Sequence, residues 1–467
     1  MTYFKHLEKA DQETVLHPFT HLREFADGKI TPRIITGGKG IHLTDQHNNT
    51  VIDGLSGLYC MNVGYGREEI ADAIHEQARK LAYCHVYYAQ SHEPLIRLSE
   101  KVIEMGPDNM ERVFYGTSGS DANETQVKLV WYYHNVIGKP NKKKIIARDR
   151  AYHGGTVITG SLTGLPAYHE LFDQPYGPIL RTGAPHYYWG AEEGESELDF
   201  SKRRAQELEE LILKEDPDTI GAFIAEPALG SGGLVPPPEG YWKEIQAVLK
   251  KYDILLIADE VVTAFGRTGE KFGSLKYGIE PDLISVAKAL TSAYIPFSGA
   301  IVSKKVAEVL RQGSDKVGMF SHGYTYTGHA LGAAAGLAVL DIIEKENLVA
   351  NARDTGDYLI GKLKEKFSDH PMVGEVRGVG LMGAVEFVAN KDRKERFDPA
   401  LKVGARIVAE ALSNNLIVRA MPNSDAIGFA PPLILTRSDA DEIVDRFDKA
   451  VKKVTDDLSR ENIWKAA

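Results

Sequence analysis

The sequence is poor in the features that mark secreted, membrane-spanning and nucleic-acid-binding proteins. Its two cysteines, Cys60 and Cys84, are too few for a disulfide framework or a cysteine metal site. The longest apolar run, residues 330–340, is shorter than the roughly 20 residues that cross a bilayer. Acidic residues outnumber basic ones, 65 to 55, so a general basic surface is missing. We expect no nucleic-acid partner and no membrane association, and the charged N-terminus predicts a cytoplasmic protein.

Several familiar motifs are also missing or incomplete. The fifteen histidines show no HExxH or paired spacing, so no metal site is expected. Two glycosylation-like triplets, at Asn48 and Asn123, are chance matches in a cytoplasmic protein. Residues 377–383 match the dinucleotide-binding fingerprint, but they lead into a strand pattern where such a site needs a helix. We therefore reject a nucleotide site there.

The pattern along the chain predicts an α/β fold. Short aliphatic runs alternate with helical patterns from about residue 95 to 290, which favours a mostly parallel central sheet with helices on both faces. Residues 34–52 predict a small antiparallel meander. At 467 residues the chain is long enough for several domains. We expect an N-terminal arm and part of a small domain at 1–60, a large domain at 61–330 and a smaller α+β domain at 331–467.

Two predicted buried strands end in a charged residue, namely Asp259 and Lys288. Ligands of open α/β sheets bind beyond the carboxyl ends of the strands, so we expect both side chains in one crevice. A carboxylate for a pyridinium nitrogen and an amine for a Schiff base are the minimal set for pyridoxal phosphate (PLP). Either residue alone could equally be a helix cap, a salt-bridge partner or a solvated side chain.

Two further stretches fit a phosphorylated, flat cofactor. Ser118, Gly119 and Ser120 follow a predicted strand and open a helix, where backbone N–H groups and the helix dipole favour an anion. An ordinary N-cap is the alternative. Tyr152 comes just after another predicted strand and could stack on a ring or be a core tyrosine.

Together these motifs resemble the class III (omega) aminotransferases, PLP enzymes of fold type I. The resemblance covers essentially the whole chain. Its most specific parts are Thr-Ser-Gly-Ser at 117–120, Ala-Tyr-His-Gly at 151–154, Ala-Asp-Glu-Val-Val-Thr-Ala-Phe-Gly-Arg-Thr-Gly at 258–269, Ala-Lys-Ala-Leu at 287–290 and Gly-Tyr-Thr-Tyr-Thr-Gly-His at 323–329.

The resemblance implies roles for individual residues. Lys288 would hold PLP through a Schiff base and shuttle protons, and Asp259 would keep the pyridine nitrogen protonated. The other implied cofactor contacts are Ser118, Gly119 and Ser120 at the phosphate, Thr325 of the partner subunit at the same phosphate, Tyr152 and Val261 on the two ring faces, and Glu226 of the Glu-Pro-x-x-Gly motif. The family's shared active sites imply a homodimer, and a tetramer is left open.

Two departures indicate a subclass. The 4-aminobutyrate-type members carry a Glu where this chain has Ser231, and an Arg at about the position of Gly428. The sequence instead resembles the amine:pyruvate branch, with Arg419 as its carboxylate-binding arginine beside a polar, turn-rich loop at 421–428. Phe19, Tyr59 and Tyr87, expected in exposed loops, would line the amine pocket together with Tyr152 and Ser231.

The predicted activity is a ping-pong transfer of an amino group from a primary amine to pyruvate, giving alanine and an aldehyde or ketone. Two alternatives stay open. One is an omega-amino-acid aminotransferase acting on β-alanine, 4-aminobutyrate or taurine. The other is a PLP-dependent aminomutase or racemase on the same fold.

Overall fold

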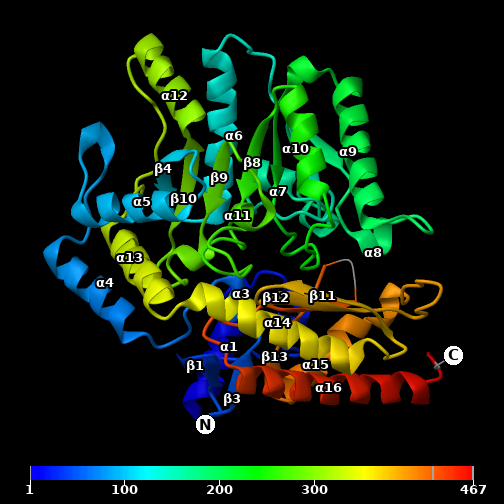
Figure 1. Cartoon of the computed structure of the whole chain (residues 1–467). Helices are drawn as coiled ribbons and strands as arrows, with labels where there is room; N and C mark the ends of the chain where they lie inside the picture. Colours follow the sequence, from blue (N-terminus) through cyan, green and yellow to red (C-terminus); the bar gives the residue numbers. More distant parts are fainter. Residues whose placement is uncertain (1, 423–424, 465–467) are drawn as a thin grey trace.

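A seven-stranded sheet lies at the centre of the larger part of the protein in the computed structural model, which describes residues 2–422 and 425–464 (Figure 1). From edge to edge its strands are β4 (Met110–Gly116), β10 (Ser298–Ser303), β9 (Leu283–Val286), β8 (Leu255–Asp259), β7 (Ile220–Ala225), β5 (Lys144–Arg148) and β6 (Ile179–Thr182). Neighbouring strands from β9 to β6 are parallel, whereas β10 is antiparallel to both of its neighbours. The mostly parallel sheet predicted from the sequence is confirmed, with one antiparallel strand that was not foreseen.

The helices of the described residues are α1 (Thr2–Thr14), α2 (Leu22–Ala26), α3 (Ser56–Tyr59), α4 (Glu68–Lys80), α5 (Glu93–Met105), α6 (Gly119–Val136), α7 (Val157–Leu162), α8 (Tyr187–Gly190), α9 (Glu197–Lys214), α10 (Tyr241–Lys251), α11 (Gly273–Tyr277), α12 (Lys304–Val317), α13 (Ala330–Lys345), α14 (Leu348–Phe367), α15 (Val403–Ser413) and α16 (Arg437–Arg460). None of them is both long and apolar enough to cross a membrane.

Helices cover both faces of the seven-stranded sheet because successive strand residues point to opposite sides. Ile257 of β8 belongs to a buried layer with residues of α6 and α12. The next residue back, Leu256, belongs to the opposite layer with residues of α9 and α10. The two-sided α/β arrangement predicted from the sequence is therefore confirmed.

The N- and C-terminal segments form two smaller sheets on the other side of the molecule, where α1 and α16 also lie (Figure 1). One sheet has the order β1 (Ile35–Lys39), β2 (His42–Asp45), β3 (Thr50–Asp53) and β13 (Leu416–Ile417). The other has the order β11 (Val373–Val379), β12 (Met382–Phe387), β15 (Ala426–Phe429) and β14 (Arg419–Ala420). The meander expected at 34–52 is present. Residues 377–383, where we rejected a nucleotide site, belong to the antiparallel hairpin of β11 and β12.

A strand from the C-terminal segment completes the N-terminal meander. Strand β13 pairs with β3 in parallel, so residues far apart in the sequence share one sheet. Close by, the Ser56 hydroxyl donates a hydrogen bond to the Ala430 carbonyl, 374 residues further along the chain. The domain boundaries expected from the sequence stay a prediction.

Two local expectations were wrong. Residues 421–428 were expected to form a polar loop, but residues 426–428 belong to the fully buried strand β15, which is paired on both sides; residues 423 and 424 of that loop lie outside the described residues. Tyr59 was expected to be exposed, but only 1% of its surface is accessible, because its ring joins a buried cluster with Leu55 and Met421. In both places the residues pair or pack with segments that are distant in the sequence, which a local pattern does not reveal.

Candidate active site

A cavity of about 290 Å³ lies beyond the carboxyl ends of β4, β7, β8 and β9. This is where an open α/β sheet places its ligand. Nine of the predicted site residues line it: Ser118, Gly119, Ser120, Tyr152, Glu226, Ser231, Asp259, Val261 and Lys288. These residues come from five separate stretches of the chain, which the fold brings together at one cavity, and their roles stay predictions.

Lys288 stands at the sharp turn after β9. Its backbone has a φ of +37°, a left-handed conformation that is costly for a residue with a side chain. Burial lowers the pKa of the Lys288 amine below its ordinary value, while the nearby Asp259 carboxylate acts in the opposite direction. A lysine with a lowered pKa holds more neutral amine at neutral pH and is a better nucleophile.

Asp259 is buried and held from three directions. Its Oδ2 accepts hydrogen bonds from Asn123 Nδ2 and His153 Nδ1, each 2.7 Å long. Its Oδ1 accepts one from the Val261 N–H at 3.1 Å. Since a carboxylate offers about four acceptor positions, Oδ1 keeps one for a donor in the cavity. The arrangement suits a protonated ring nitrogen.

The tautomer of His153 follows from its surroundings. Its Nε2 is buried without a hydrogen-bond partner among the described residues, whereas Nδ1 faces the carboxylate. A proton on Nε2 would be a buried, unsatisfied donor, which is costly. A proton on Nδ1 fits this site, and that N–H donates a hydrogen bond to Asp259 Oδ2.

The N-terminus of α6 forms the other end of the cavity. Ser118 caps the helix in a capping box with Asp121, whose carboxylate also accepts from Thr117. The first N–H groups of a helix have no carbonyl partner within the helix, and the dipole favours an anion there. A Cβ at Gly119 would lie 3.0 Å from Val261, so glycine lets the helix start approach that side chain closely. Both readings of this motif, cap and anion site, are compatible with the structure.

Glu226 lies at the end of β7 on the cavity wall. Burial raises the pKa of its carboxyl. Its Oε1 accepts from the Gly230 N–H at 3.1 Å, and its Oε2 is buried without a hydrogen-bond partner among the described residues. The Arg148 guanidinium lies 3.6 Å from Oε2. A buried, unsatisfied oxygen at a cavity wall is a place where a ligand donor can bind.

Arg419, Tyr59 and Phe19 do not line this cavity, but they connect to it through Tyr168. The Arg419 guanidinium lies near the hydroxyls of Tyr59 and Tyr168, where its positive charge opposes the rise in their pKa that burial causes. Tyr168 also packs against Tyr152, with ring centroids 5.2 Å apart, and against Phe19, at 5.3 Å. Phe19 is 82% exposed, which leaves one face of its ring open. The sequence did not single out Tyr168, because nothing in the pattern around Pro166 marks it.

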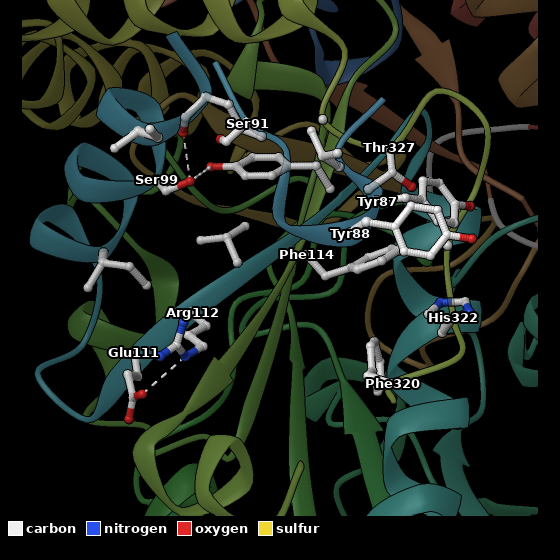
Figure 2. A pocket seen from close by; sticks show the side chains of 18 of the residues that line it. Tyr87, Tyr88, Ser91, Ser99, Glu111, Arg112, Phe114, Phe320, His322 and Thr327 are labelled. Carbon is white, nitrogen blue, oxygen red and sulfur yellow. Dashed lines mark hydrogen bonds and ion pairs between the residues drawn. The ribbon is translucent and has the colours of Figure 1, made fainter. Parts of the chain in front are cut away.

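Thr325 and Tyr87 lie outside this cavity, and Tyr87 belongs to a second and larger hollow of about 1260 Å³ (Figure 2). Tyr87 lines it, and Figure 2 shows the rings of Tyr88, Phe114 and His322 gathered on the same side. Thr325 is exposed, and its carbonyl accepts a hydrogen bond from the Tyr83 hydroxyl at 2.7 Å. Within one protomer, neither residue is brought to the cavity that holds Lys288.

Asn123 and His153 are site residues that the sequence reading missed. Asn123 was set aside as a chance glycosylation triplet, yet it is buried and hydrogen-bonds both Asp259 and the His153 carbonyl. Its place in the second turn of α6, just after the predicted anion loop, was a usable signal. His153 directly follows Tyr152 in a motif that we had already singled out.

Comparisons with known proteins agree with this geometry. Residues 25–451 match the class-III aminotransferase family. The chain is 60% identical to an uncharacterized aminotransferase of Sinorhizobium fredii, over 98% of both chains. It is 57% identical to a diaminobutyrate–2-oxoglutarate transaminase of Halomonas elongata, over the full length of both. A solved omega transaminase of Pseudomonas jessenii in complex with PMP is 42% identical, with a TM-score of 0.94 over 97% of this chain and 99% of that one.

The residues around the cavity fit PLP. Asp259 has a free acceptor position, Glu226 has an unsatisfied oxygen, Lys288 offers an amine with a lowered pKa, and a helix N-terminus faces the cavity. The seven-stranded sheet is that of PLP fold type I, as the class-III enzymes have it. The chain therefore belongs to the class-III aminotransferases and is a PLP-dependent transaminase.

Proposed function

We propose that this transaminase moves an amino group from a primary amine to pyruvate, giving alanine and an aldehyde or ketone. The observation that carries the proposal is the placement of its positive charge. Arg419 on β14 is the direct cross-strand partner of Gly428 on β15, the position at which the 4-aminobutyrate branch is expected to carry an arginine. Residues opposite each other in an antiparallel pair lie on the same face of the sheet. Arg419 therefore carries a positive charge on the same face as position 428, but from the neighbouring strand.

Packing around Gly428 supports this reading. A Cβ at Gly428 would lie 2.7 Å from Met421 Sδ and 2.8 Å from Leu234 Cδ1, so a side chain there needs its neighbours to move. The other member of the 4-aminobutyrate pair is also missing, because Ser231 lines the cavity where a Glu would stand. An acceptor carboxylate would then bind Arg419, which lies near Tyr59 and Tyr168, through a bidentate fork.

We assign the chemistry to the residues as follows. When bound, PLP supplies an electron-withdrawing ring that accepts the electron pair left by deprotonation of the substrate carbon. Lys288 holds the cofactor and moves that proton with its Nζ. Asp259 would hold the ring nitrogen through the remaining acceptor position of Oδ1, and Asn123 and His153 fix its carboxylate. Ser118, Gly119, Ser120 and the partner subunit's Thr325 bind the phosphate.

A homodimer with shared active sites follows from the same proposal. Thr325 and Tyr87 do not reach the cavity of their own protomer, and the hollow around Tyr87 exposes apolar side chains, including Tyr88 and Met319. Exposed apolar patches of this kind mark protein–protein contacts. A second copy of the chain seated there would bury Tyr88. The cytoplasmic location expected from the sequence stays a prediction.

The alternative within the family is an omega-amino-acid aminotransferase that uses 2-oxoglutarate. It is favoured by the 57% identical relative, whose name gives diaminobutyrate and 2-oxoglutarate as substrates. Single-turnover reactions separate the two. The aminated enzyme is mixed with pyruvate or with 2-oxoglutarate, and the rate of its spectral change is measured. We expect pyruvate to react at least tenfold faster, and the opposite order would refute pyruvate as the acceptor.

A panel of donors completes the test. Simple primary amines, β-alanine, 4-aminobutyrate, taurine and diaminobutyrate are each supplied with the better acceptor. Stoichiometric formation of the aminated acceptor distinguishes a transferase from an aminomutase or racemase, which needs no second substrate.

A further inference from the structure

A fully buried loop, residues 226–235, forms one wall of the active-site cavity. Loops normally lie on the surface, because buried carbonyl and N–H groups must find partners. Within the loop, Leu229 and Val235 exchange two backbone hydrogen bonds, and the Gly230 carbonyl accepts from Gly233 and Leu234. Other carbonyls of the loop accept from outside it: Glu226 from Arg148 and Pro227 from Trp242. The carbonyls of Gly232 and Gly233, directly after Ser231, are likewise satisfied from outside.

Two arginines from different parts of the chain donate to these two carbonyls. Arg377 of β11 donates to the Gly233 carbonyl through Nε at 3.0 Å and Nη2 at 2.7 Å. Arg150, two residues before Tyr152, donates to the Gly232 carbonyl through Nε at 3.0 Å. A Cβ at Gly232 would lie 2.2 Å from the Arg150 carbonyl, so the loop and the Arg150 backbone are in close contact.

Carboxylates hold the Arg377 guanidinium in place from the side away from the loop. Its Nη1 donates to Glu375 at 2.6 Å and its Nη2 to Glu386 at 2.8 Å, and Glu386 is completely buried. Trp189 donates a further hydrogen bond to Glu386, and His186 bridges Arg150 and Glu375. A planar guanidinium with all three of its nitrogens engaged is a rigid fork, which an ammonium cannot imitate.

We propose that Arg377 and Arg150 are positioning residues that set where Ser231 stands in the cavity and thereby tune substrate affinity. The inference rests on the proposed role of Ser231 as a residue facing the substrate. Neither arginine lines the cavity, so both act through the two carbonyls. Because Arg377 lies on β11, the proposal also gives the four-stranded sheet β11-β12-β15-β14 a part in determining which substrates bind.

The test uses the holoenzyme with Arg377→Lys, Ser231→Ala and the double variant. Lysine keeps the positive charge between Glu375 and Glu386 but loses the fork on the Gly233 carbonyl. Arg203→Lys is the matched control, since Arg203 also joins a carbonyl, that of Gly190, to carboxylates, but on α9. Three quantities are measured: amide hydrogen exchange of peptides covering 226–235, the affinity of the apoenzyme for PLP, and KM and kcat for both substrates.

In Arg377→Lys we expect exchange in this loop to become about tenfold faster, and KM to rise about tenfold, the factor that corresponds to one lost hydrogen bond. PLP affinity should stay within about twofold of the wild type. Arg203→Lys should change neither the exchange rate of the loop nor KM. In the Ser231→Ala background the lysine substitution should raise KM by less than about twofold, because its effect passes through Ser231.

Unchanged exchange in the loop, or an equal KM increase with and without the Ser231 hydroxyl, would overturn the proposal. So would a parallel loss of PLP affinity and kcat, which indicates a general structural role. If Arg377→Lys does not accumulate, Arg150→Lys in the less buried arginine is judged by the same criteria. The exchange measurement needs no substrate, and the kinetics use whichever acceptor is turned over. Rejection of pyruvate would thus refute the proposed acceptor and leave this test intact.

Discussion

Replacement of His153 by Phe tests how the carboxylate of Asp259 is held in place. The ring of similar size fills the buried space but removes the Nδ1–H donor that lies 2.7 Å from Asp259 Oδ2. Asn123 and the Val261 N–H still donate to the carboxylate, so Asp259 keeps two of its three partners. The variant should therefore fold and bind PLP, with Asp259 less firmly oriented.

The size of the effect follows from the bond that is lost. A hydrogen bond to a charged group contributes about 1.5–3 kcal/mol. If the transition state depends on the whole of it, kcat/KM falls by about ten- to 150-fold. Steady-state transamination with the best pair of substrates measures this loss. In parallel, the free energy of unfolding of the apoenzyme should fall by a similar amount, because the bond is also present without the cofactor.

A double-mutant cycle with Asp259→Asn decides whether the effect passes through the carboxylate. In that background His153→Phe should cost little further activity, because the charge that His153 supports is gone. His134→Phe is the control: His134 is another fully buried histidine, which donates to the Gly221 carbonyl rather than to a residue of the cavity. An equal loss from His153→Phe in both backgrounds would refute the reasoning, as would a loss smaller than about threefold in the wild type.

Three further predictions follow. Lys288→Ala should abolish turnover and remove the Schiff-base absorption while PLP still binds weakly. Absorption spectra measure the Schiff base and a coupled assay measures turnover. Wild-type-like activity would exclude Lys288 as the Schiff-base residue. Arg419→Ala should slow the single-turnover reaction with pyruvate at least tenfold, the value of one bidentate ion pair, and nearly spare the reaction with a simple monoamine; equal losses in both half-reactions would argue against a carboxylate switch. Burial lowers the pKa of His134 to about 4. The unfolded chain therefore binds a proton at this histidine at a higher pH than the folded protein does, and the free energy of unfolding falls as the pH drops from about 6.5 to 4. Urea unfolding at pH 7 and pH 4.5 should show a smaller difference for His134→Gln than for the wild type, and an unchanged difference would rule out this histidine as a source of acid sensitivity.

The features that the sequence predicts well are those encoded by neighbouring residues. Asp259 and Lys288 each follow a short aliphatic run, and the carboxyl ends of parallel strands meet at one edge of the sheet. The anion loop before α6 is likewise a local pattern of glycine and hydroxyl residues. For these, chain order and the α/β topology are enough to bring the groups together.

The features that it misses depend on partners far away in the sequence. The donors to Asp259 come from Asn123 and His153, and a local pattern cannot say which side chains will meet a buried carboxylate. Strand β15 looked like loop because its four residues follow a polar stretch, yet β12 and β14 pair with it on both sides. Tyr59 looked exposed for the same reason, since Met421, which covers it, is distant in the chain.

The parallel pairing of β3 with β13 has a consequence for biosynthesis. On the ribosome, Thr50–Asp53 is made long before Leu416–Ile417 and Ala430. At about 5–20 residues per second, the 374 residues between Ser56 and Ala430 take about 20–75 s to translate. Throughout that interval β3 presents an unpaired edge and the apolar side chains of Val51 and Ile52, both of which are completely buried in the finished protein. The nascent chain must therefore be shielded at this strand, and overproduction that outpaces chaperone capacity should cause aggregation there first.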